Sequence, residues 1–255
     1  MKRGILLSWV FLMISGCARS PKTRDIQSTA TESATITSPT ETLAPKPSPT
    51  QVAATAEPSK ITFQDNFEGF LSKNWQWLNE DPANWSLQTV PGSLQINIGR
   101  GYLTRNNAGN VLLLPAPEGN FQIETSLTFL TEKHTHFAGL LLYESEKNFI
   151  QAGHAYCNSI NRCVGDGLYL EEYAQGNLLK EPYIAQKYGR TSVSLRLIYR
   201  DGMLTFLSSP NGLVWYQINE SKVDLKILQV GLVAGQNLKE AAPVLFDYFQ
   251  VKSLK

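Results

Sequence analysis

The sequence lacks a charge imbalance. Its 255 residues include 23 lysines and arginines against 22 aspartates and glutamates, so the formal net charge is +1 at pH 7. Binding to a polyanion depends on an excess of positive charge on one surface. The composition therefore gives no support to a nucleic-acid partner, and we expect none.

The sequence also lacks an apolar run long enough to cross a bilayer, which takes about 20 residues. Its one notable run, Ile5 to Ile14, follows a short basic start and is typical of a secretory signal. The run ends in ISGC, which resembles the lipobox of bacterial lipoproteins. This resemblance implies that residues 1–17 are a signal peptide with Cys17 as the lipid anchor. We expect an extracytoplasmic protein tethered to the membrane of the cell envelope; the alternative is a plain signal peptide with an incidental cysteine.

Large apolar side chains are almost missing from residues 18–60, which are rich in Ser, Thr, Pro and Ala. Such a segment cannot bury enough surface to fold. We expect a disordered linker that holds the rest of the chain away from the membrane. Residues 61–255 are then long enough for one domain with a single core.

Cysteine is scarce: apart from Cys17, the chain has only Cys157 and Cys163. Outside the cytoplasm, two nearby cysteines usually pair. Their spacing excludes a CxxC metal or redox site, and the Asn and Ser between them favour a turn. We expect a small loop closed by a disulfide that fixes the local shape.

Helical periodicity is absent over any three turns. Short β-branched, aromatic and leucine-rich runs alternate instead with Gly, Asn, Asp and Pro, which predicts an all-β, antiparallel β-sandwich. The expected strands are residues 61–67, 85–90, 93–98, 111–114, 121–130, 137–143, 149–156, 168–173, 192–199, 204–208, 214–219, 229–234 and 245–251.

Several segments resemble one family, in one order along the chain. They are DNF at residues 65–67, NWQWLNEDPANWSL, PGSLQI, GLLLYESEKNFIQ, SPNGLVWYQI and the closing LFDYFQV. The set resembles the concanavalin A-like domain at the C-terminus of family 43 glycoside hydrolases such as β-xylosidases, which implies a jelly roll over residues 61–255. Trp75, Trp77 and Trp85 could stack on sugars or fill a core. By the resemblance, we expect them to brace the first strands and the Asp81-Pro82 turn, with Trp77 or Trp85 buried in the sandwich.

The resemblance implies no catalytic residue in this chain. In that family the catalytic carboxylates lie on a propeller that precedes the domain, whereas a signal and a linker precede it here. Glu144 and Glu146 have the spacing of an acid pair, but the letters Ser-Glu-Lys-Asn favour a solvated turn. We expect no enzymatic activity, with a cryptic glycoside hydrolase as an alternative.

Two metal sites are conceivable. All three histidines, His134, His136 and His154, fall in one region, but no acidic or cysteine ligand accompanies them, so hydrogen-bonded histidines are the default. The resemblance implies a structural calcium between the first and last strands, with Asp65 and Asp247 as ligands. The alternative is that backbone donors satisfy Asp247. No other cofactor is expected.

Carbohydrate binding needs an aromatic platform beside planar polar groups. Alternation places Tyr169, Glu171 and Tyr173 on one face of a strand, and neighbouring strands would add others. The candidates are Tyr143, His154, Tyr169, Glu171, Tyr173 and Arg196. They predict a polysaccharide or glycan partner; equally, the tyrosines could pack into the sandwich with only their hydroxyls exposed. A structural or protein-interaction domain of the envelope is the alternative function.

Overall fold

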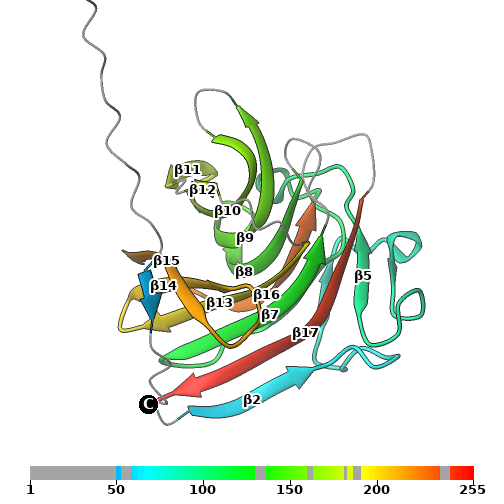
Figure 1. The fold of residues 1–255 in the computed structure, drawn as a ribbon, viewed down its shortest axis with the longest axis horizontal. Helices are drawn as coiled ribbons and strands as arrows, with labels where there is room; N and C mark the ends of the chain where they lie inside the picture. Colours follow the sequence, from blue (N-terminus) through cyan, green and yellow to red (C-terminus); the bar gives the residue numbers. More distant parts are fainter. Residues whose placement is uncertain are drawn as a thin grey trace, which may run out of the picture. The chain divides into compact units, whose positions relative to one another are not determined.

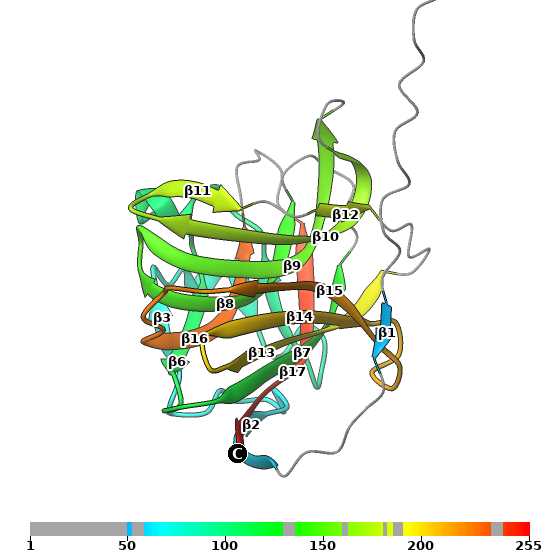
Figure 2. The same cartoon turned by 90° about the vertical axis from the view of Figure 1, so that its left-hand side faces the viewer.

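The computed structural model describes residues 50–52, 59–129, 136–159, 163–180, 183–185, 191–235 and 242–255. Two antiparallel β-sheets pack against each other, which confirms the predicted sandwich (Figures 1 and 2). Two 3₁₀ turns, η1 (Pro82–Asn84) and η2 (Leu103–Arg105), accompany the strands. Within these ranges, no helix has the length and apolarity needed to cross a membrane.

Sheet A has nine strands, in the order β1-β15-β14-β13-β7-β17-β5-β4, and β2 also pairs with β17. The long strand β17 pairs along one side with β5 and then with β2. The bounds are β1 Thr50–Val52, β2 Ser59–Asp65, β4 Trp85–Ser86, β5 Leu94–Asn97, β7 Phe121–Phe129, β13 Ser192–Arg200, β14 Met203–Ser209, β15 Trp215–Lys222 and β17 Pro243–Leu254.

Sheet B has eight strands, in the order β11-β10-β9-β8-β16-β6-β3, and β12 also pairs with β10 (Figure 2). The bounds are β3 Gln76–Leu78, β6 Val111–Pro115, β8 Phe137–Ser145, β9 Asn148–Ser159, β10 Cys163–Ala174, β11 Asn177–Lys180, β12 Tyr183–Ala185 and β16 Gln229–Gly235.

Sheet B is strongly curved, as β9 and β10 show in Figure 1, and two opposed glycines let two of its strands approach closely. Gly139 of β8 lies opposite Gly153 of β9. A Cβ atom at Gly139 would lie 2.2 Å from the carbonyl oxygen of Ala152, and one at Gly153 would lie 2.1 Å from that of Ala138. Only glycine fits this close approach of two strands.

Every expected strand has an observed counterpart, but four short strands, β1, β3, β11 and β12, were not expected. They lie at sheet ends or beside an outer strand, where pairing needs few apolar side chains and leaves little sequence signal. One corrects an expectation: Thr50–Val52, within the expected linker, pairs with β15. Its hydrogen bonds come from the backbone, which composition does not reveal. Likewise, β2 begins at Ser59.

The three clustered tryptophans serve the core and one edge of the sandwich. Trp75 is buried, with its ring 5.3 Å from that of Phe63 and 5.1 Å from that of Phe249. Half-buried Trp77 and Trp85 come from β3 and β4, the last strands of the two sheets, and their ring centroids lie 5.0 Å apart. They close the edge between the sheets, in agreement with a bracing role, but the buried tryptophan is Trp75 and not Trp77 or Trp85 as expected.

Candidate functional site

Four of the predicted sugar-binding residues share the outer face of sheet B, the face turned away from sheet A. The strand register places Tyr173 beside Phe149 and Phe149 beside Tyr143. Alternation along β10 then puts Glu171 and Tyr169 on the same side. We call this surface the tyrosine face: Tyr143, Phe149, Gln151, Tyr169, Glu171 and Tyr173.

Side chains of the tyrosine face use many of their hydrogen-bonding groups and ring surfaces on one another. The Tyr169 hydroxyl donates to Glu171 Oε1 at 2.6 Å, and Gln151 Nε2 donates to Glu171 Oε2. Tyr173 stacks on Phe149 with the centroids 4.5 Å apart. Glu171 is 5% exposed and Tyr143 8%. The face is therefore more filled than an open platform would be.

Burial also fixes the protonation of Tyr143. Desolvation, and to a lesser extent the charge of Glu146, raises the pKa of its hydroxyl above the ordinary tyrosine value. The group stays neutral at physiological pH, so it can donate a hydrogen bond but carries no charge.

His154 does not join this face, which corrects the prediction. It lies opposite Leu168 and Ala138 in the ladder, and all three side chains point into the sandwich. Its ring meets Phe129 edge-on at 6.0 Å, and it is 1% exposed. Desolvation lowers its pKa to about 4, so it is neutral at pH 7.

His136 also packs on Phe129, with ring centroids 5.7 Å apart, and is buried. The remaining histidine of the conceivable zinc site, His134, lies outside the described residues. Within the described chain there is no group of three or more His, Cys, Asp or Glu side chains able to hold a metal.

Arg196 faces away from the apolar row of β13, as expected, but it lies on the outer face of the other sheet. Its guanidinium donates to Glu124 Oε2 at 2.7 and 2.8 Å and lies 3.7 Å from the ring centroid of Trp215. The Tyr248 hydroxyl donates to Glu124 Oε1 at 2.7 Å. Both sheets separate this network from the tyrosine face, so the prediction that they form one site is wrong.

The two aspartates of the expected calcium site are engaged by donors of the chain. Asp65 accepts from the backbone nitrogens of Phe67 at 2.9 Å and Ser72 at 3.0 Å, and from Trp75 Nε1 at 2.8 Å. Asp247 accepts from the Ser126 hydroxyl at 2.8 Å. These contacts give both carboxylates a structural role and add no support for a shared ion.

The remaining predictions fall partly outside the described residues. Cys17 lies outside them, as do the side chains of Cys157 and Cys163. Backbone pairing places Cys157 opposite Gly165 and Cys163 opposite Ser159, so the cysteines are diagonal neighbours on one hairpin. The disulfide and the lipid anchor therefore stay predictions.

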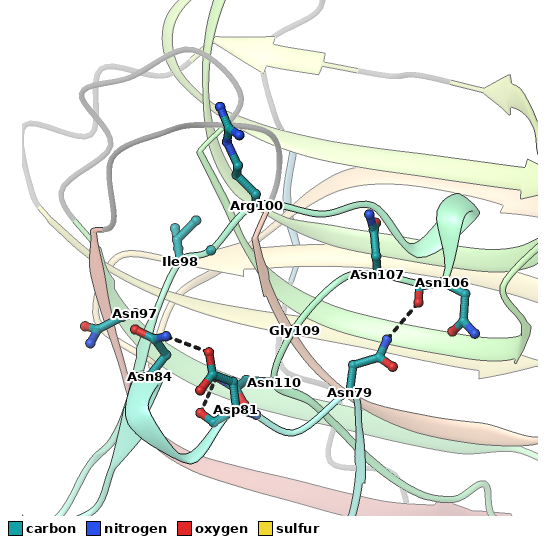
Figure 3. A pocket seen from close by; sticks show the side chains of 11 residues that line it. Asn79, Asp81, Asn84, Asn97, Ile98, Arg100, Asn106, Asn107, Gly109 and Asn110 are labelled. Atoms are coloured by element: carbon teal, nitrogen blue, oxygen red, sulfur yellow. Dashed lines mark hydrogen bonds between the residues drawn. The ribbon is translucent and has the colours of Figure 1, made fainter. Parts of the chain in front are cut away.

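A polar pocket that sequence reasoning missed lies at one end of the β4–β5 pair (Figure 3). Its volume is about 600 Å³, within the range of about 300–1,000 Å³ typical of small-ligand sites. We call it the asparagine pocket. Its polar lining consists of Asn79, Asn84, Asn97, Asn106, Asn107 and Asn110 with Asp81 and Arg100.

Two of these asparagines fasten the loops that form the pocket. Asn110 is buried; its Oδ1 accepts from the backbone nitrogen of Asp81 at 2.7 Å, and its Nδ2 donates to the Asp81 carbonyl at 3.2 Å. Asn79 Nδ2 donates to the carbonyls of Asn106 and Ala108, both at 3.1 Å. Asn79, Asn106 and Asn110 have φ of 55°, 50° and 53°, a region that asparagine tolerates better than most residues.

Three other asparagines of the pocket have only one atom of the side-chain amide in a hydrogen bond with the described chain. Asn84 Nδ2 donates to Asp81 Oδ2 at 2.7 Å, and its Oδ1 makes no hydrogen bond in the described chain (Figure 3). Asn97 Oδ1 accepts from Gln95 at 3.1 Å and Asn107 Oδ1 from the backbone of Tyr102 at 2.9 Å. The Nδ2 groups of Asn97 and Asn107 donate no hydrogen bond within the described chain. The pocket thus offers oriented donors and acceptors.

One loop connects the pocket with the tyrosine face. Arg100, Asn106 and Asn107 line the pocket, while Leu103 and Ala108 of the same loop pack into the apolar cluster on the outer face of sheet B. The loop is thereby anchored on sheet B while three of its polar residues line the pocket.

A family model described as the β-xylosidase C-terminal concanavalin A-like domain matches residues 64–252. The chain belongs to this family. The predicted recognition and fold are therefore confirmed for this domain, and the match covers nearly all of the β-sandwich. No curated protein sequence matches the chain.

Solved structures share the concanavalin A-like fold. The GH43 protein BlXynB from Bacillus licheniformis is 20% identical over 74% of this chain and 38% of its own, with a TM-score of 0.67. A xylan β-1,4-xylosidase from Bacillus halodurans C-125 is 20% identical over 74% and 39%, with a TM-score of 0.63. The CBM2 module of evolved Dit from Lactobacillus casei BL23 phage J-1 is 9% identical over 78% and 97%, with a TM-score of 0.54.

The chain spans only 38% and 39% of the length of the two GH43 proteins. At 20% identity the likeness concerns the fold alone, so the function of the concanavalin A-like domain has to be argued from its own residues.

Proposed function

We propose that this concanavalin A-like domain binds carbohydrate without catalysis of its own, and that the asparagine pocket is its ligand site. The observation that carries the proposal is the set of held amides around a cavity of about 600 Å³, each with one polar atom not used by the described chain.

Sugar hydroxyls match this lining chemically. Each hydroxyl donates and accepts, and a primary amide offers both functions in one plane. Asn84 supplies an acceptor, whereas Asn97 and Asn107 supply donors. Because their partners in the chain already hold these side chains, little conformational entropy is lost on binding.

The lining does not suit glycoside hydrolysis, which uses two carboxyl groups on either side of the scissile bond. Asp81 is the one carboxylate among the described lining residues, and its Oδ2 already accepts from Asn84. Elsewhere, the turn expected at Glu146 is found between β8 and β9, and Glu144 lies at a register shift. These placements favour binding over cleavage.

Xylan is the first polymer to test, because one relative of the same fold is a xylan β-1,4-xylosidase. Isothermal titration calorimetry of the full chain with soluble xylan and arabinan, together with pull-down on cellulose, should show binding to at least one polymer. Asn84→Ala and Asn107→Ala should each weaken it about tenfold, the effect of one lost hydrogen bond.

Asn177→Ala is the matched control, because Asn177 is an exposed asparagine in the hairpin of β10 and β11. It should bind like the wild type. No binding of the wild type to any of the polymers, or wild-type affinity in both pocket variants, would refute the proposal. Release of reducing sugar from any of the polymers would instead favour a glycoside hydrolase.

A further inference from the structure

The structure places an exposed aromatic ring on the same edge of the sandwich as the asparagine pocket. We infer that Phe70 forms a second sugar-binding subsite there, so that the ligand is a polysaccharide chain that spans both places. This inference rests on the proposed function of the pocket.

Phe70 is 75% exposed, and no other aromatic side chain described by the structure is classed as exposed. Covering this ring with a partner would gain free energy, because apolar surface would be removed from water. The flat face of an aromatic ring is suited to stacking on the apolar face of a sugar.

The loop that carries Phe70 is firmly held. As described above, the buried Asp65 carboxylate accepts from Phe67, Ser72 and Trp75, which lie on both sides of Phe70 in sequence. Phe67 is fully buried and has φ of 55°, an uncommon conformation for a bulky residue. The backbone on both sides of Phe70 is therefore held in place, which lowers the entropy cost of ordering the loop on binding.

Polar groups lie beside this ring. A cavity of about 660 Å³ is lined by Phe70 together with Gln64, Asn66 and Asn74. Gln250 Nε2 donates to Gln64 Oε1 at 3.0 Å, and Gln64 Nε2 donates to Asn66 Oδ1 at 2.8 Å. A ring next to oriented amides is the combination that carbohydrate recognition needs.

The two subsites lie at opposite ends of β4. Asn84 precedes Trp85, the first residue of β4, on the side of the asparagine pocket (Figure 3). Gln88 follows β4, and its Nε2 approaches the Gly69 carbonyl in the Phe70 loop at 3.5 Å. Only Trp85 and Ser86 between these residues are extended, but the neighbouring strand β17 gives the spacing: Pro243 lies opposite Asn97 of the asparagine pocket, and Phe249 lies opposite Asp65 of the Phe70 cavity. Six residues of strand correspond to about 20 Å. This gap exceeds one sugar ring, so a single ligand reaching both places must be a chain of several sugars.

The Trp77 and Trp85 rings, tilted by 34° to each other, lie on the edge where the two subsites are found. Trp85 belongs to β4 itself, and Trp77 comes from β3 at the same edge. Both rings are half-buried. This edge therefore gives a polysaccharide chain partly apolar surface between the amides of the asparagine pocket and the ring of Phe70.

Calorimetry with xylo-oligosaccharides of increasing length and soluble xylan tests the inference, with cello-oligosaccharides and arabinan in parallel. Wild-type affinity should rise with chain length until both subsites are filled. Phe70→Ala should lower the affinity for the long ligands about tenfold and leave the shortest bound ligand unaffected. Phe70→Tyr should restore the affinity, because it keeps the ring.

Leu213→Ala is the control, since Leu213 is a 79% exposed apolar residue of another loop. It should bind like the wild type at every length. The inference is overturned if affinity is independent of length, or if Phe70→Ala binds long ligands normally. Capture of a protein through Phe70, with wild-type glycan binding in Phe70→Ala, overturns it as well. If the wild type binds no carbohydrate, the proposed function fails together with this inference. If the wild type binds carbohydrate but Phe70→Ala binds long ligands normally, only this inference fails.

Discussion

The tyrosine face and the asparagine pocket differ in how their polar groups are used. In the tyrosine face, the buried carboxylate of Glu171 accepts from Tyr169 and Gln151, and Tyr173 lies flat on Phe149. In the pocket, amides such as Asn84 and Asn107 keep one polar atom outside the hydrogen bonds of the described chain. Residue types alone favour the tyrosines as a sugar site, whereas unused hydrogen-bonding capacity favours the asparagines.

The two regions should differ most in their response to acid, because the buried His154 lies on the inner side of β9, the strand whose outer side carries Phe149 and Gln151 of the tyrosine face. Folding lowers the pKa of His154 from about 6.5 to about 4, so its stabilising contribution is complete above pH 6.5 and is lost as the pH falls toward 4. Urea unfolding should show a loss of at most about 3 kcal/mol over this window.

His154→Gln is the test variant, since its side chain stays neutral. Its free energy of unfolding should change much less between pH 6.5 and 4 than that of the wild type. An equal slope in both proteins would show that other groups dominate the acid sensitivity. Amides do not titrate in this range, so the hydrogen bonds of Asn84, Asn97 and Asn107 should persist while the protein remains folded.

Asn110→Ala should affect stability and binding together. Asn110 is 2% exposed and makes two hydrogen bonds to the backbone of Asp81, so its removal leaves buried groups unpaired at a cost of about 2 kcal/mol. Thermal unfolding should shift downward, and carbohydrate affinity should fall because the 79–84 loop is released. Asn110→Asp is the comparison: it keeps the acceptor for the Asp81 N–H but turns a buried carboxylate oxygen toward the Asp81 carbonyl, so at pH 7 it should be destabilised at least as much as Asn110→Ala. Normal affinity in folded Asn110→Ala would show that the loop is not part of the site.

The fold was predictable because the long strands carry a strong period-two signal. In β13, Val193, Leu195 and Leu197 are buried on the inner face, as alternation predicts. The sequence also predicted that Tyr169, Glu171 and Tyr173 share a face. It could not assign His154 or Arg196, because the face and the sheet that a residue occupies depend on the register and order of strands far apart in sequence.

The pocket was not predictable in the same way, because loops build it. Asn79 and Asn110 are brought together by a hydrogen bond from the Asn110 nitrogen to the Asn79 carbonyl, across a sequence gap that no periodicity covers. A weaker signal was present: all six asparagines of the pocket fall in the segment from Asn79 to Asn110, and three of them have positive φ. Asparagine in such loops also marks ordinary turns, so density alone could not distinguish a site from a turn.

Tyr173→Ala should have the smallest effect, and it tests the comparison directly. Loss of the stacking on Phe149 should cost about 1 kcal/mol of stability in urea unfolding, because Tyr173 is half-buried at the side of the cluster. Carbohydrate affinity should stay within about twofold of the wild type, since Tyr173 lies outside the asparagine pocket. If Tyr173→Ala instead weakens binding tenfold while Asn84→Ala does not, the tyrosine face is the ligand site. The filled appearance of that face would then reflect side chains that rearrange when the ligand binds.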